Sequence, residues 1–217
     1  MLDKEGRYYN LGLPVWTYSA DVLPTGGVVV YSRANEYTDA SSLWLRKDGR
    51  DSLLVRGDNE IFAWVRWSPR GDKIAFLRSK IGAKNADEAR QLWMVNPDGT
   101  GATRIAGNVL WAYPPMWSPD GQKLLIAVQE NSGVNSIAVD YETLESNIAE
   151  YDTTSQVLRK LTSFHGARAL YPSYSGDGAS VVFVADQSGA DEAWRIKGGK
   201  LEQLTNDGAP KQYPILP

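Results

Sequence analysis

The chain has 217 residues, of which 42% are hydrophobic and 23% are charged, so it can bury the core of a folded globular protein. Its formal net charge is −3, and its 23 basic and 26 acidic residues are interspersed, which argues against nucleic acid as a partner. No apolar stretch approaches the roughly 20 residues of a membrane span, and the absence of cysteine excludes disulfides and cysteine nucleophiles.

The N-terminal segment 1–12 matches the last part of a repeated unit, namely the end of a third strand, a turn and a fourth strand. Met1–Asn10 is charged and lacks the apolar stretch of a secretory signal. A signal that was removed would leave the same N-terminus, so the segment does not fix the compartment.

A short phrase then recurs along the chain. It reads Trp67-Ser68-Pro69-Arg70-Gly71-Asp72, Trp117-Ser118-Pro119-Asp120-Gly121-Gln122 and Tyr174-Ser175-Gly176-Asp177-Gly178-Ala179, and a worn copy, Leu23-Pro24-Thr25-Gly26-Gly27, precedes them. In the worn copy, Asp21-Val22-Leu23 stand where Trp-Ser-Pro is expected. The copies recur at about the 40–50 residues that a four-stranded propeller blade needs.

Each copy predicts a turn, because proline presets φ, aspartate bonds its own backbone and glycine accepts a positive φ. An apolar strand follows every turn: Val28–Tyr31, Ile74–Leu77, Leu124–Val128 and Val181–Val184. Two further strands complete each unit, and turn residues join the strands as antiparallel hairpins. We expect no long helix, only one helical turn within Asn85–Gln91.

The sequence therefore predicts a single all-β domain, a β-propeller of four-stranded antiparallel blades. The expected blades are residues 13–57, 58–107, 108–163 and 164–208, with an insertion at 131–147 in the third. Residues 209–217 match the first strand of a further blade. The two chain ends would complete either a closed ring of five blades or one blade of a larger propeller of six to eight blades, of which this chain is a fragment.

The phrase Trp-Ser-Pro-Asp-Gly, the later Leu92-Trp93-Met94-Val95-Asn96-Pro97-Asp98-Gly99-Thr100 and a closing Leu-Thr resemble the TolB-like, WD-like β-propeller repeat. This resemblance covers nearly the whole chain. It implies the fold, and it implies a periplasmic or extracellular binding module, with a cytoplasmic location as the alternative. Related propellers also occur as domains of serine peptidases and as sugar-acid lyases.

Catalytic residues are not evident in the sequence. His165 is the single histidine, so a metal site built on two histidines is impossible and any Ser-His-Asp triad would need this residue. The nucleophile elbow Gly-x-Ser-x-Gly is missing. Paired carboxylates such as Asp87-Glu88 and Asp191-Glu192 fall in polar surface loops. We therefore predict no catalytic residue, no metal site and no cofactor.

Aromatic and cationic residues gather where one blade leads into the next, and these linkers are expected to open around the central channel. Such residues suit a protein, peptide or carbohydrate partner. The predicted binding residues are Trp64, Arg66, Trp111, Tyr113, His165, Arg168 and Tyr213. The favoured hypothesis is a non-enzymatic recognition propeller, and the alternative is the propeller domain of an enzyme, a peptidase or a sugar-acid lyase. The oligomeric state stays open.

Overall fold

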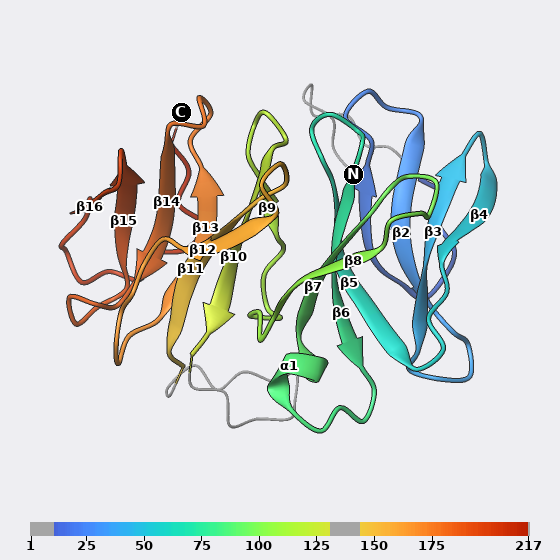
Figure 1. The fold of residues 1–217 in the computed structure, drawn as a ribbon, viewed down its shortest axis with the longest axis horizontal. Coiled ribbons are helices and arrows are strands. Elements are labelled where there is room, and N and C mark those ends of the chain that lie inside the picture. The colour runs from blue at the N-terminus through green and yellow to red at the C-terminus, as the bar shows by residue number, and fades with distance from the viewer. Residues whose placement is uncertain (1–10, 131–143, 217) are drawn as a thin grey trace.

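The computed structural model describes residues 11–130 and 144–216, which form four antiparallel sheets of four strands each. The sheets lie side by side in chain order (Figure 1), and we call them blades 1 to 4. Blade 1 consists of β1 (Thr17–Val22), β2 (Val28–Ala34), β3 (Ser41–Lys47) and β4 (Arg50–Val55). Blade 2 consists of β5 (Glu60–Trp67), β6 (Ile74–Lys80), β7 (Gln91–Val95) and β8 (Thr103–Gly107).

Blades 3 and 4 repeat this order, so the strands of every blade are hydrogen-bonded in the sequence in which they occur. Blade 3 consists of β9 (Met116–Trp117), β10 (Lys123–Gln129), β11 (Ser146–Asp152) and β12 (Val157–Lys160). Blade 4 consists of β13 (Ala169–Tyr174), β14 (Ser180–Ala185), β15 (Glu192–Lys197) and β16 (Lys200–Gln203). The expected helical turn is also confirmed, as α1 (Ala86–Ala89), which Asn85 caps by accepting a hydrogen bond from the Glu88 N–H.

The repeated phrase forms the turn between the first and second strands. In blade 3 the Ser118 N–H donates to the Lys123 carbonyl at 2.9 Å, and the Gly121 N–H donates to the Ser118 carbonyl at 2.8 Å. The Ser118 hydroxyl donates to Asp120 at 2.6 Å and accepts from the Lys123 N–H at 2.9 Å. Gly121 has φ +67, a value that glycine adopts without steric cost. The turn is thus closed by its own side chains.

Buried apolar side chains form three clusters, and each lies between two successive blades. Second strands contribute most, because both of their faces are covered; all six residues of β14 are buried, for example. The aromatic residues that open the phrase differ in depth. Trp67 and Tyr174 are buried, whereas Trp117 is half-buried against the cluster between blades 2 and 3. The blades are held together by the rings of the phrase together with the second strands.

The first copy of the phrase is shifted by one residue from the expected alignment. The Leu23 N–H donates to the Val28 carbonyl, as the Ser68 N–H donates to the Lys73 carbonyl, so Val22 takes the place of Trp67. Asp21 then stands one position earlier. Its carboxylate accepts from the Trp67 N–H at 2.8 Å and ties β1 to β5.

The chain ends differ in part from the expectation. Residues 209–216 form no strand in the part of the chain that the structure describes, because no neighbouring second strand offers them a ladder. The expected pairing of the two ends involves residues 1–10, which lie outside the described residues, so ring closure and the total blade number stay predictions. Most of the insertion, residues 131–143, is likewise outside them. None of the described helices is long and apolar enough to cross a membrane.

Candidate functional site

Two first strands carry the same irregularity, a bulge three residues before the phrase aromatic. The register of β5 shifts between Ala63 and Arg66, and that of β13 shifts between Leu170 and Ser173. Trp64 and Tyr171 occupy these bulges with φ +53 and +54, a left-handed conformation that bulky residues rarely adopt. Such strain persists where the surroundings enforce it, and it marks these two rings as candidates for function.

Trp64 and Trp111 meet at the boundary between blades 2 and 3. The Trp64 indole N–H donates to the Trp111 carbonyl at 2.7 Å, and both rings pack partly buried against the cluster between these blades. Arg66 has other partners at this boundary: its carbonyl accepts from the Trp117 indole N–H at 3.3 Å, and its guanidinium donates to the Val65 carbonyl at 2.9 Å. The structure thus brings Trp64 and Trp111 into contact, and the hydrogen bonds from Trp64 to Trp111 and from Trp117 to Arg66 join blades 2 and 3.

Three tyrosines form a second aromatic group at the boundary between blades 3 and 4. The ring centroids of Tyr113 and Tyr171 are 4.3 Å apart, and those of Tyr171 and Tyr213 are 4.4 Å apart. Tyr113 is buried, whereas Tyr213 is 62% exposed. A proline follows each of these tyrosines in the sequence. We call this row of rings the tyrosine ladder.

The tyrosine ladder forms one wall of a groove with a volume of about 110 Å³. Nearly all of the lining is apolar. It consists of Tyr113, Pro114, Met116, Tyr171, Pro172, Ser173, Tyr213, Pro214 and Ile215. An apolar groove with a few hydroxyl groups can bind apolar side chains and fix their orientation by hydrogen bonds.

The remaining predicted residues, His165 and Arg168, do not line this groove. Arg168 is ion-paired with Asp191 at 3.0 Å and with Asp186 at 3.5 Å, and its backbone N–H donates to Asp186 at 2.7 Å. His165 is exposed in the loop between β12 and β13. The structure thus places Tyr113 and Tyr213 in one groove, Trp64, Arg66 and Trp111 at a neighbouring boundary, and His165 and Arg168 in a third place.

Sequence reasoning left several groove residues outside its set, among them Tyr171, Met116, Pro172 and Ile215. A signal for Tyr171 was present, because the dipeptide Tyr-Pro recurs at Tyr113-Pro114, Tyr171-Pro172 and Tyr213-Pro214. No sequence period predicts Met116, which lies in β9, or Ile215, which lies in the C-terminal tail where Tyr213 packs against Tyr171 of blade 4.

Within residues 11–130 and 144–216, no group of three or more His, Asp or Glu side chains could hold a metal ion. His165 is exposed and lies close enough to Glu130 to interact with its carboxylate electrostatically.

Comparison with known proteins shows which proteins share this fold. No family model matches the chain. The uncharacterized peptidase YuxL of Bacillus subtilis is 26% identical over 197 residues, which are 78% of this chain and 29% of that protein. The putative TolB of Agrobacterium tumefaciens has a similar structure, with a TM-score of 0.58 and 19% identity over 92% of this chain and 65% of that one.

Peptidase structures are similar to the same degree. The β-propeller domain of the trilobed protease of Pyrococcus furiosus matches with a TM-score of 0.57 and 15% identity, over 88% of this chain and 58% of that one. The acylaminoacyl peptidase of Pyrococcus horikoshii gives 0.59 and 15%, over 88% of this chain and 32% of that one. The chain spans less than a third of the length of the peptidase YuxL. Its fold is that of the TolB-like β-propellers, which confirms the all-β fold class of four-stranded antiparallel blades.

Proposed function

We propose that this chain is a non-enzymatic recognition propeller that binds an extended peptide segment of a protein partner in the groove along the tyrosine ladder. One observation carries the proposal: Tyr113, Tyr171 and Tyr213, which come from successive blade entrances, combine into one apolar groove. Aromatic rings offer a large contact area at low entropic cost, so they dominate binding energies at such surfaces.

The groove favours a peptide over a carbohydrate because its lining is nearly all apolar, whereas a sugar needs many polar partners. The other predicted residues have weaker support. Trp64, Arg66 and Trp111 lie at the boundary between blades 2 and 3, and His165 and Arg168 lie in the loop that leads into β13. We propose that they extend the contact surface around the groove.

Fluorescence anisotropy with labelled extended peptides tests this function. A peptide library with apolar residues should contain binders, and Tyr213→Ala should weaken them about tenfold or more, because aromatic hot spots contribute about 2 kcal/mol or more. Tyr213 is exposed, so its removal leaves the core intact. The matched control is Tyr37→Ala, since Tyr37 is 87% exposed and lies on blade 1. Equal binding by both variants, or binding of oligosaccharides alone, would contradict the proposal.

A second candidate function is that of a propeller domain in a peptidase. The similarity to the peptidase YuxL favours it. None of the relatives named above is a lyase. Sequencing the gene on both sides of these 217 codons and assaying the activity of its full product would decide between the two functions. Hydrolysis of peptide substrates that a serine-directed inhibitor abolishes would support the peptidase.

We further propose a periplasmic or extracellular location, which fractionation of the native host tests.

A further inference from the structure

A second cleft lies between blades 3 and 4, at the end of the blades that carries the turns of the repeated phrase. It has a volume of about 440 Å³. One wall carries Lys123, Glu150, Arg159 and Lys160, and the other includes the two-residue turn Gly198-Gly199 between β15 and β16. The linkers between blades lie at the other end of the strands, so this cleft is separate from the groove along the tyrosine ladder.

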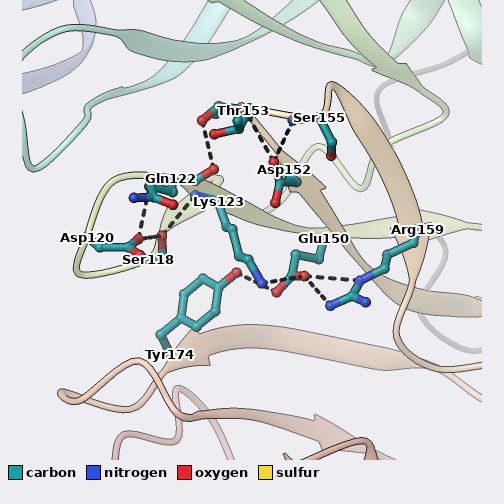
Figure 2. A network of polar contacts seen from close by, with 11 residues as sticks. Ser118, Asp120, Gln122, Lys123, Glu150, Asp152, Thr153, Ser155, Arg159 and Tyr174 are labelled. Carbon is teal, nitrogen blue, oxygen red and sulfur yellow. Dashed lines mark hydrogen bonds and ion pairs between the residues drawn. The ribbon is translucent and has the colours of Figure 1, made fainter.

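Glu150 is the centre of a buried network in this cleft, as Figure 2 shows. Its carboxylate accepts from Arg159 at 2.7 Å and from Lys123 at 3.2 Å. The Tyr174 hydroxyl, which comes from blade 4, donates to the same carboxylate at 2.9 Å. Burial acts to raise the pKa of Glu150, but these hydrogen bonds outweigh it, and the pKa is lowered overall. Glu150 therefore stays ionised and fixes two cations at the cleft.

The other blades show that this arrangement is not a general feature of the repeat. At the equivalent cross-strand position, blade 4 pairs Arg195 with Glu202, whereas blade 1 pairs Leu45 with Ser52. In blade 4 the arginine lies on the third strand and faces an acid on the fourth. Blade 3 reverses the order, and Lys123 adds a second cation. Two cations thus share a single buried carboxylate.

The other charged groups near the cleft are bound to other partners. Lys160 is paired with Glu130 at 2.6 Å. Asp120 and Asp152 lie near Lys123, but they do not line the cleft. Asp120 accepts from the Ser118 hydroxyl and the Gln122 N–H, and Asp152 accepts from the Thr154 and Ser155 N–H groups. Their carboxylates are hydrogen-bonded within their own turns, so they do not take up the N–H donors of the cations at the cleft.

Lys123 and Arg159 retain unused donors. The Arg159 side chain is 63% exposed and binds Glu150 through Nε and Nη2, which leaves Nη1 without a partner among the described residues. The Lys123 ammonium has three N–H groups and uses one for Glu150. The facing turn has no side chains that could close the cleft. A guanidinium and an ammonium side by side are the groups that proteins use for phosphate and carboxylate.

We propose that this cleft binds an oxyanion, a phosphate or carboxylate group of a small ligand, between Lys123 and Arg159. Glu150 acts as a positioning residue that holds both cations, and Tyr174 fixes Glu150 from blade 4. The proposal rests on charges and contacts in this cleft and is independent of the function proposed for the tyrosine ladder.

Titration of the 217-residue chain with inorganic phosphate and, separately, with succinate tests the site. Both titrations are followed by amide NMR at constant ionic strength, with chloride as the reference salt. We expect saturable shifts of the Gly198 and Gly199 amides and of the Arg159 Nε–H with at least one of the two anions. Phosphate alone would identify a phosphate ligand, and succinate alone a carboxylate ligand.

Arg159→Gln should weaken that binding about tenfold or more, because it removes charged hydrogen bonds. The matched control is Arg46→Gln, which removes the same charge from the cross-strand pair Arg46–Asp51 in blade 1 and should change binding less than about twofold. If Arg159→Gln loses the dispersed spectrum of a folded protein, Lys123→Gln takes its place. The absence of saturable shifts with both anions, or equal binding by Arg159→Gln and Arg46→Gln, would overturn the proposal.

Discussion

The hydroxyl group of Tyr174 offers a test of the interface between blades 3 and 4. Tyr174→Phe removes the donor that lies 2.9 Å from the Glu150 carboxylate and leaves the ring in place. Tyr174 is 9% exposed and Glu150 is 5% exposed, so water cannot readily replace the lost hydrogen bond. We expect the free energy of unfolding to fall by about 1.5–3 kcal/mol, the range for hydrogen bonds to charged groups.

The loss should depend on pH with a definite sign. Hydrogen bonds hold the folded-state pKa of Glu150 below its usual value near 4.5. A carboxyl group of this kind contributes stability above its unfolded pKa, and that stability is lost as the pH falls through the folded pKa. The difference between the native chain and Tyr174→Phe should therefore be full at pH 7 and shrink below about pH 4.

Urea unfolding followed by tryptophan fluorescence measures both effects. Tyr37→Phe is the matched control, because Tyr37 is 87% exposed, and it should change the unfolding free energy by less than about 0.5 kcal/mol. A loss in Tyr174→Phe no larger than that of the control would refute the reasoning. A loss that stays constant between pH 7 and pH 3 would show that the hydroxyl group does not act through Glu150.

Three further substitutions test the packing of the blades. Ser146→Ala removes a buried hydroxyl that accepts from the Ala169 N–H at 3.0 Å and donates to the Ala169 carbonyl at 2.8 Å; urea unfolding should show a loss of about 1–3 kcal/mol, and exposed Ser163→Ala almost none. Trp117→Ala should cost about 3 kcal/mol in the same assay, and less than about 1 kcal/mol would mean that the ring does not support the interface between blades 2 and 3. Gly57→Ala would place a Cβ atom 2.0 Å from the Ser41 carbonyl oxygen and 2.6 Å from the Phe62 ring. It should lower the Tm by about 5 °C or more, and an unchanged Tm would contradict that close approach.

Tyr174 also shows what a comparison of the repeated phrases can predict about a residue and what it cannot. The repeated phrase places it in the position of Trp67 and Trp117, as one more ring at a blade interface. The structure adds that its hydroxyl group has a partner, Glu150, in the preceding blade. At the equivalent position in blade 3 the Trp117 indole N–H donates to the Arg66 carbonyl of blade 2, so the two rings bind different groups of the preceding blade.

Local residue patterns were sufficient to predict the strands and turns. Turn chemistry acts within a few residues, as in the Ser118–Lys123 turn, and apolar runs such as that of β14 mark strands covered on both faces. The period of the phrase then predicted four blades of four antiparallel strands, because each unit can bury its faces only against its neighbours. For these features, the sequence alone was enough.

The combination of side chains into sites was decided only by the tertiary structure. The linkers are equally aromatic in sequence, yet Trp64 contacts Trp111, whereas Tyr113 contacts Tyr171, and Arg168 is bound by Asp186 and Asp191. These contacts depend on how far one blade is displaced from the next and on where bulges turn a ring. They join residues 18 to 58 positions apart in the sequence. No local pattern encodes such distances, because they follow from the packing of whole sheets against each other.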